Sequence, residues 1–133
     1  MDKLTEGVIC EMGAGPELDA LCATAVGFKW ENKIHGCCIA RGNNSPDPDR
    51  LWSPSCCWSE AGDLLIWLRG KPFKPVGLEY DNLERNWLVT RSSFFYADAN
   101  SPCLAIARAV AIAGLRARPK KMQKAWKALK EER

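Results

Sequence analysis

The sequence predicts an α+β fold in which helices flank a small antiparallel sheet. First, three apolar segments, residues 14–28, 53–70 and 101–115, have the spacing and the end residues of helices. Second, residues 77–98 are rich in aromatic and β-branched residues, which favour strands. Third, the chain has 133 residues, of which 47% are apolar and 26% charged, and this is typical of a single folded domain.

The first helix is expected at residues 14–28. Pro16 suits the first turn of a helix, where its missing N–H would have no partner, and Gly27 suits the end. Glu17 and Asp19 favour the positive end of the helix dipole. The apolar stripe that this helix is expected to bury consists of Leu18, Leu21, Cys22 and Ala25. A strand can begin directly after it, at residues 28–30.

A loop at residues 41–55 leads into the second helix, which is expected at residues 53–70. Ser53 or Ser55 can cap the start of this helix. Its apolar stripe consists of Cys57, Ala61, Leu64, Leu65 and Leu68. Residues 71–77 are expected to form a linker, because their prolines fit neither a helix nor a central strand.

Residues 86–90 and 93–97 are expected to be strands of an antiparallel sheet. The third helix follows them, with Ser101 as its cap and Pro102 at its first position. Arg108 is the only charged residue in this helix. We therefore expect the helix to be mostly buried, against the sheet.

Charge divides the chain into two parts. Residues 1–115 carry 11 Lys and Arg against 14 Asp and Glu, whereas residues 116–133 carry 8 against 2. This predicts a domain at residues 1–115 and a basic amphipathic helical extension at residues 116–133. Its apolar face consists of Met122, Trp126 and Leu129.

The basic extension is the candidate binding segment. It can bind nucleic-acid phosphates, an anionic surface or a partner protein, or it can pack its apolar face on its own domain. The candidate binding residues are Arg116, Arg118, Lys120, Lys121, Lys124, Trp126 and Lys127. The six Trp, four Phe and two Tyr residues can add stacking surfaces, although most of them are expected in the core.

The sequence predicts a cytosolic protein that does not cross a membrane. No apolar run reaches the roughly 18–20 residues that span a bilayer, and the first residues lack the layout of a signal peptide. Thiols stay reduced in cytosol and the number of cysteines is odd, so we expect core thiols and no disulfides. The seven cysteines are Cys10, Cys22, Cys37, Cys38, Cys56, Cys57 and Cys103.

A metal or catalytic site is the alternative use of these cysteines. His35, the only histidine, and Cys37 can meet Cys56 or Cys57 across the loop, but neither cysteine pair has the CxxC spacing of structural zinc sites. A catalytic Cys–His pair would also need a depressed thiol pKa, which nothing in the sequence indicates. Turn formation explains the carboxylates of Asp47, Asp49, Glu79, Asp81 and Glu84. We expect no enzymatic activity, cofactor or metal, and a small zinc-binding protein is kept as an alternative.

Three stretches of the sequence together carry a family resemblance. AGPELDALCATAVGFKW, PSCCWSEAGDLLIWL and FFYADANSPCLAIARAVAIAGL occur in this order, from about residue 14 to residue 116. The family pattern that they resemble is a Gly-x-x-Leu-Asp first helix, a Pro-x-Ser start of the middle helix and an Ala-x-Ala-rich last helix. In this the chain resembles the phage ABA sandwich domain, a family of small proteins encoded by bacteriophages and prophages.

The resemblance implies helices on both sides of a small antiparallel sheet, an α/β/α sandwich, and no established catalytic residues. Cys56 and Cys57 stand where the family usually has Thr-Asp, and the tail beyond Arg116 lies outside the shared pattern. We therefore expect a non-enzymatic phage or prophage accessory protein that binds a host protein or a nucleotide ligand in the host cytoplasm, and that can counteract host defence. A nucleic-acid-binding protein that uses the basic C-terminal helix is the alternative. The sequence does not indicate an oligomeric state.

Overall fold

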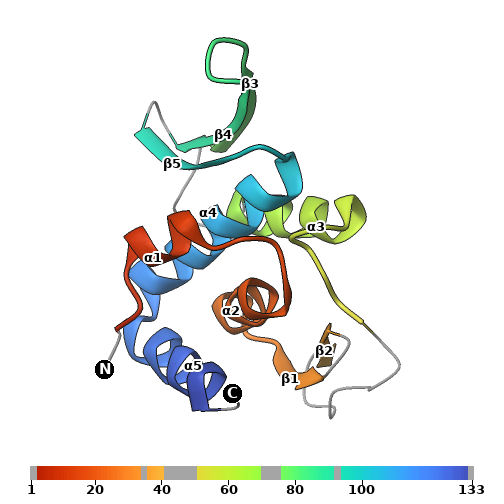
Figure 1. Cartoon of the computed structure of the whole chain (residues 1–133), viewed down its shortest axis with the longest axis vertical. Coiled ribbons are helices and arrows are strands. Elements are labelled where there is room, and N and C mark those ends of the chain that lie inside the picture. The colour runs from red at the N-terminus through yellow and green to blue at the C-terminus, as the bar shows by residue number, and fades with distance from the viewer. Residues whose placement is uncertain (1–2, 34–35, 41–50, 70–75, 92–93, 132–133) are drawn as a thin grey trace.

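The computed structural model describes residues 3–33, 36–40, 51–69, 76–91 and 94–131. These residues form five helices and five strands (Figure 1). The helices are α1 (Glu6–Glu11), α2 (Pro16–Val26), α3 (Trp58–Arg69), α4 (Pro102–Ala117) and α5 (Pro119–Glu131). The strands are β1 (Lys29–Lys33), β2 (Gly36–Ala40), β3 (Val76–Asp81), β4 (Asn86–Arg91) and β5 (Phe94–Ala99). The predicted α+β fold, in which helices flank a small antiparallel sheet, is confirmed.

Helix α4 is the central element of the fold. It packs against α1, α2, α3 and α5, and also against strands β4 and β5 (Figure 1). Residues 103–107 and 109–114 are buried, and between them lies the charged residue Arg108, whereas Arg116 is exposed in the last turn. The Arg108 guanidinium donates hydrogen bonds to the carbonyl oxygens of Met12 (3.0 Å) and Asp98 (2.7 Å). Arg108 therefore joins the segment before α2 to β5 across the central helix.

The main sheet has the order β3-β4-β5 with antiparallel neighbours. Val89 on β4 is opposite Leu78 on β3 and Ala97 on β5, so these three residues share one face. Val89 and Ala97 are fully buried, and their strands pack on α4. The predicted packing of the apolar helix against the sheet is confirmed. Strands β1 and β2 form a separate two-stranded sheet beside α2.

Helix ends follow the predicted chemistry in α2 and α4. Helix α2 begins at Pro16 and ends before Gly27, whose φ of 90° is the left-handed conformation that glycine adopts readily. The Ser101 hydroxyl accepts a hydrogen bond from the Leu104 N–H at the start of α4.

Two elements of the structure were not expected. Helix α1 has only six residues, too few to show a period, and its start is capped by Thr5, whose hydroxyl accepts the Val8 N–H. Strand β2 was not expected either, and strand β3 begins at Val76, inside the linker predicted at residues 71–77. Helix α3 begins at Trp58, later than predicted, after a turn in which the Cys57 N–H donates to the Ser53 carbonyl (2.7 Å).

The C-terminal helix packs its apolar face on the rest of the chain. Met122, Trp126 and Leu129 are buried, and α5 packs against α2 and α4. Gln123 exchanges two hydrogen bonds with the backbone of Leu4, at 2.9 and 2.7 Å. The division into a domain at residues 1–115 and an extension at residues 116–133 stays a prediction. Helix α4 continues to Ala117, and the apolar face of α5 joins the same core.

Gly114 allows α4 to approach α2 closely. A Cβ atom at this position would overlap the Cβ of Ala25 and lie 3.0 Å from its Cα and 3.2 Å from the Met122 sulfur. We predict that Gly114→Ala lowers the free energy of unfolding by about 1–3 kcal/mol, because overpacking outweighs the gain in helix propensity. Urea denaturation followed by circular dichroism measures this change.

Gly62→Ala is the matched control, since Gly62 lies in α3 with open space where its Cβ would be. There the propensity gain of up to about 1 kcal/mol should raise stability. An unchanged or raised stability of the Gly114 variant would contradict the role assigned to the close approach.

Candidate functional site

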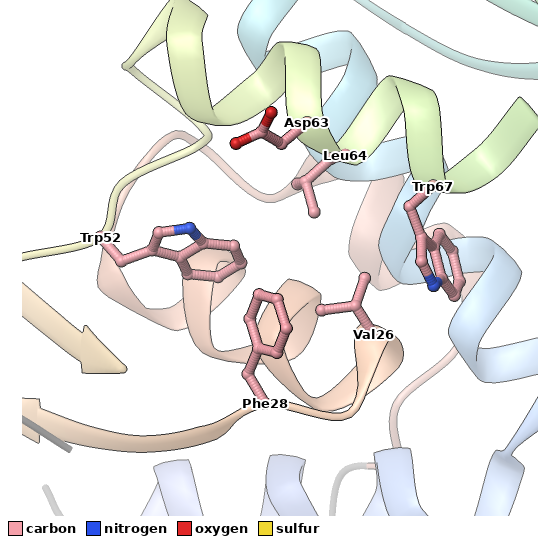
Figure 2. A pocket seen from close by; sticks show the side chains of 6 residues that line it. All are labelled: Val26, Phe28, Trp52, Asp63, Leu64 and Trp67. Atoms are coloured by element: carbon pink, nitrogen blue, oxygen red, sulfur yellow. The ribbon is translucent and has the colours of Figure 1, made fainter. Parts of the chain in front are cut away.

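An aromatic pocket lies where the end of α2, the start of β1 and helix α3 meet (Figure 2). Its lining consists of Val26, Phe28, Trp52, Asp63, Leu64 and Trp67. Figure 2 shows the rings of Phe28, Trp52 and Trp67 arranged around the hollow, with the Asp63 carboxylate at its edge. The volume is about 190 Å³. This is below the roughly 300–1,000 Å³ of sites for drug-sized ligands, so the pocket suits a single ring system or side chain.

Local structure positions each of these rings. The left-handed turn at Gly27 carries the chain from α2 into β1, and the Phe28 N–H donates to the Ala23 carbonyl (2.8 Å). Phe28 and Trp52 pack edge to face with ring centroids 5.9 Å apart. On α3, Leu64 and Trp67 are three residues apart and therefore on the same side of the helix.

The pocket is suited to binding a flat group. Aromatic rings offer faces and edges for stacking, and Asp63, which is exposed, can accept a hydrogen bond from an N–H of a ligand. Among the described residues that line this pocket, Asp63 is the one ionisable side chain. The lining therefore provides binding surface and one polar contact for orientation.

A buried network holds α3 and the pocket in place against α2. The Asp19 carboxylate, 2% exposed, accepts the backbone N–H of Ser55 (3.0 Å), and the Ser55 hydroxyl accepts the backbone N–H of Gly15 (3.1 Å). Just beyond it, the Ser53 N–H donates to the Glu60 carboxylate (2.8 Å). The start of α2, at Gly15 and Asp19, therefore contacts Ser55 in the segment before α3 directly, which their sequence separation did not indicate.

Burial raises the pKa of Asp19 from 3.8 to about 6. The hydrogen bonds from Ser55 lower this pKa but do not offset the desolvation, and the nearby Glu60 raises it further. Asp19 lies inside the network and is not among the residues that line the aromatic pocket, so we assign it a structural role.

The predicted binding residues of the C-terminal helix have different environments. Lys120, Lys121, Lys124 and Lys127 are exposed on the face of α5 opposite its buried residues. Trp126 is 5% exposed, with the Lys130 ammonium 4.3 Å from its ring centroid, so its ring is part of the core and unavailable for stacking on a ligand. Arg116 makes a bidentate ion pair with Glu6, both hydrogen bonds measuring 2.8 Å, and this contact lowers the pKa of Glu6.

A second, open hollow adjoins the turn between α4 and α5. It is lined by Arg118, Pro119, Lys120 and Lys121 and has a volume of about 470 Å³. Three of the four lining residues are cationic. Of the predicted binding residues, Arg118, Lys120 and Lys121 therefore border this hollow.

The cysteine and carboxylate candidates do not come together as a site in the described residues. Burial raises the pKa of the Cys103 thiol, with the nearby Cys57 and Cys56 thiols adding to the effect, so Cys103 is held protonated. Among the described side chains, no three His, Cys, Asp or Glu residues are arranged to hold a metal ion. His35, Asp47 and Asp49 lie outside the described residues, as do the side chains of Cys37 and Cys38, so the zinc hypothesis stays a prediction.

The predicted turn role of one carboxylate has direct support. The Asp81 carboxylate accepts the N–H of Leu83 at 2.9 Å, at the end of β3.

Sequence reasoning did not identify the aromatic pocket. Its rings come from the residue before β1, from the segment before α3 and from α3 itself, and only packing brings these together. The available indication was the number of tryptophans, six in 133 residues, without any spacing that relates them.

Comparisons with models of known protein families and with curated protein sequences find no match. The resemblance to the phage ABA sandwich domain stays a prediction. In the part of the chain that the structure describes, no helix has both the length and the apolar character needed to cross a membrane.

The raised pKa of Asp19 predicts a specific dependence of stability on pH. Because the folded-state pKa is above the unfolded value, the contribution of Asp19 to the free energy of unfolding is complete below about pH 4 and is lost as the pH rises to about 6. The loss is about 2–3 kcal/mol. Asp19→Asn keeps an oxygen that can accept the Ser55 N–H and has no charge to desolvate. The difference in free energy of unfolding between this variant and the wild type should therefore change by that amount between pH 4 and pH 7.

Urea denaturation of both proteins at several pH values measures this difference. Glu11→Gln, at an exposed position at the end of α1, is the control and should follow the wild-type profile. Asp19→Ala should lose about 1–3 kcal/mol at every pH, because it leaves the buried Ser55 N–H without an acceptor. Parallel profiles for the wild type and Asp19→Asn would contradict the raised pKa.

Proposed function

We propose that the protein is a non-enzymatic binding protein that holds a planar ring of its ligand in the aromatic pocket. The observation that carries this proposal is the arrangement of Phe28, Trp52 and Trp67 around a hollow of about 190 Å³. An apolar hollow with a polar group at its edge is the usual form of a small-ligand site.

The composition of the lining supports binding. Acid–base catalysis uses a group whose pKa is tuned to the reaction, and nucleophilic catalysis uses a nucleophile beside a base. The described residues of the lining instead present five apolar or aromatic side chains and one exposed carboxylate. Those groups hold and orient a ring.

The resemblance to the phage ABA sandwich domain supports a biological setting for this activity. We propose an accessory protein of a phage or prophage that acts in the host cytoplasm by occupying a host protein or a nucleotide ligand, and so counteracts host defence. A ring in the pocket is then either a side chain of that host protein or the base of that nucleotide. The setting rests on the resemblance, and the ring-binding activity rests on the pocket.

Nucleic-acid binding is a second candidate function. The observation that favours it is the row of exposed lysines on α5, where Lys120, Lys124 and Lys127 follow one another at helical spacing. Such a row can contact successive phosphates, whereas the buried Trp126 cannot contribute stacking.

The pocket proposal predicts binding of small planar compounds. Indole and the four ribonucleosides, titrated by calorimetry and followed by tryptophan fluorescence, should bind at one site per chain. Trp67→Ala should weaken this binding at least roughly fivefold, because an aromatic stack is lost. Trp58→Ala is the matched control, since Trp58 is on the same helix but 56% exposed and not in the lining, and it should leave the affinity unchanged. The absence of binding by every compound in the panel would contradict the proposal.

The nucleic-acid candidate predicts a steep dependence on salt. If three phosphates of duplex DNA are contacted, affinity should fall about 40-fold between 50 and 200 mM salt. Reversing the charges of Lys120, Lys121 and Lys124 to Glu should abolish binding in an anisotropy assay. Arg69→Glu, at an exposed position on α3, is the control variant. Binding that is insensitive to salt and to the triple change would exclude this candidate.

A further inference from the structure

The aromatic pocket and the basic hollow border the same turn. Val26 and Phe28, which flank Gly27, line the aromatic pocket, whereas Arg118 lines the basic hollow. A Cβ atom on Gly27 would lie 3.6 Å from the Arg118 guanidinium nitrogen Nη1. The Arg118 guanidinium is therefore packed against the backbone of the residue that separates the two pocket-lining side chains.

Helix packing places Arg118 beside Gly27. Helix α5 packs against α2, and the Arg118 N–H donates to the Gly114 carbonyl (2.7 Å) as the chain leaves α4. The first residues of α5 are thereby placed beside the end of α2. Gly27 itself has no side chain to separate Arg118 from the turn.

The cations at this hollow are not neutralised by the protein. In the described residues, the side chains of Arg118, Lys120 and Lys121 have no ion-pair partner, whereas Arg116 pairs with Glu6 and Lys127 with Glu131. Three neighbouring cations without ion-pair partners favour the binding of an anion, and a guanidinium can donate two hydrogen bonds to the oxygens of a phosphate.

We propose that the ligand is a nucleotide, with its base in the aromatic pocket and its phosphate against Arg118, Lys120 and Lys121. This inference rests on the proposed function, because the aromatic pocket supplies the base site. The base is recognised by stacking on Phe28, Trp52 and Trp67, and the phosphate by charge-assisted hydrogen bonds. The sugar joins the two groups past the turn at Gly27.

The test compares each of the four ribonucleosides with its 5′-monophosphate in calorimetric titrations of the full chain at low salt. For at least one base, the monophosphate should bind roughly tenfold more tightly than the nucleoside, since charge-assisted hydrogen bonds are gained. Raising the salt should reduce this difference, because the basic hollow is open to solvent. Arg118→Gln should remove most of the difference and leave the nucleoside affinity unchanged.

Lys124→Gln is the matched control. It also removes one exposed cation from the C-terminal region, but Lys124 does not line the hollow, so the preference for the monophosphate should persist. Circular dichroism melting of both variants establishes that they are folded.

The outcomes separate this inference from the proposed function. Equal affinities for nucleosides and monophosphates, unaffected by Arg118→Gln, would overturn the phosphate site and leave the ring pocket standing. Binding of indole without binding of any nucleoside or nucleotide would overturn the assignment of the ligand as a nucleotide. The absence of binding by all planar compounds would overturn both proposals. A loss of monophosphate preference in Lys124→Gln as large as in Arg118→Gln would show a general charge effect and overturn the assignment to this hollow.

Discussion

The fold depends on the burial of α4 among the other elements. Its buried residues are mostly alanine and other small residues. They let α2 approach so closely that Ala25 occupies the space that a Cβ atom on Gly114 would need. Close packing of this kind yields many dispersion contacts per unit length, and the apolar area removed from water is the main favourable term. The sheet then covers a further side of α4 through β4 and β5, and Arg108 joins the surrounding segments through their carbonyl groups.

The candidate pocket is a consequence of this packing rather than a separate module. Helix α3 rests on α4, and the Asp19–Ser55 network sets the segment before α3 against α2. Phe28 and Trp52 can then meet Trp67 across a hollow that none of the three elements would form alone. The network stabilises this arrangement through buried hydrogen bonds, at the cost of desolvating a carboxylate, and that cost raises the pKa of Asp19.

Helix packing also decides where the basic residues of the C-terminal segment lie. The apolar face of α5 is covered by α2 and α4, so the lysines of its opposite face stay in water. Arg118 at the start of this region is directed to the turn at Gly27, beside the aromatic pocket. A basic segment that begins at residue 116 in the sequence is thus adjacent, in space, to the turn at Gly27, whose neighbours Val26 and Phe28 line the aromatic pocket.

The sequence by itself determined the local structure. Pro16, Gly27, Ser101 and Pro102 mark helix ends because backbone sterics and capping act over one turn, and the period of apolar residues identifies the buried faces. It also predicted strands β4 and β5 and the apolar stripe of α5. Helix α1 escaped prediction because six residues are too few to establish a helical period, and strand β2 was not expected either.

Only the tertiary structure decided which candidate residues are available and which meet. Trp126, a predicted binding residue, is buried in the core, because the apolar face of α5 gains more from burial than from exposure. Arg116, another predicted binding residue, forms an ion pair with Glu6. The aromatic pocket, the Asp19–Ser55 network and the position of Arg118 against Gly27 each join residues far apart in the chain. Their proximity follows from how helices pack, and side-chain patterns along a single chain do not encode which faces will be neighbours.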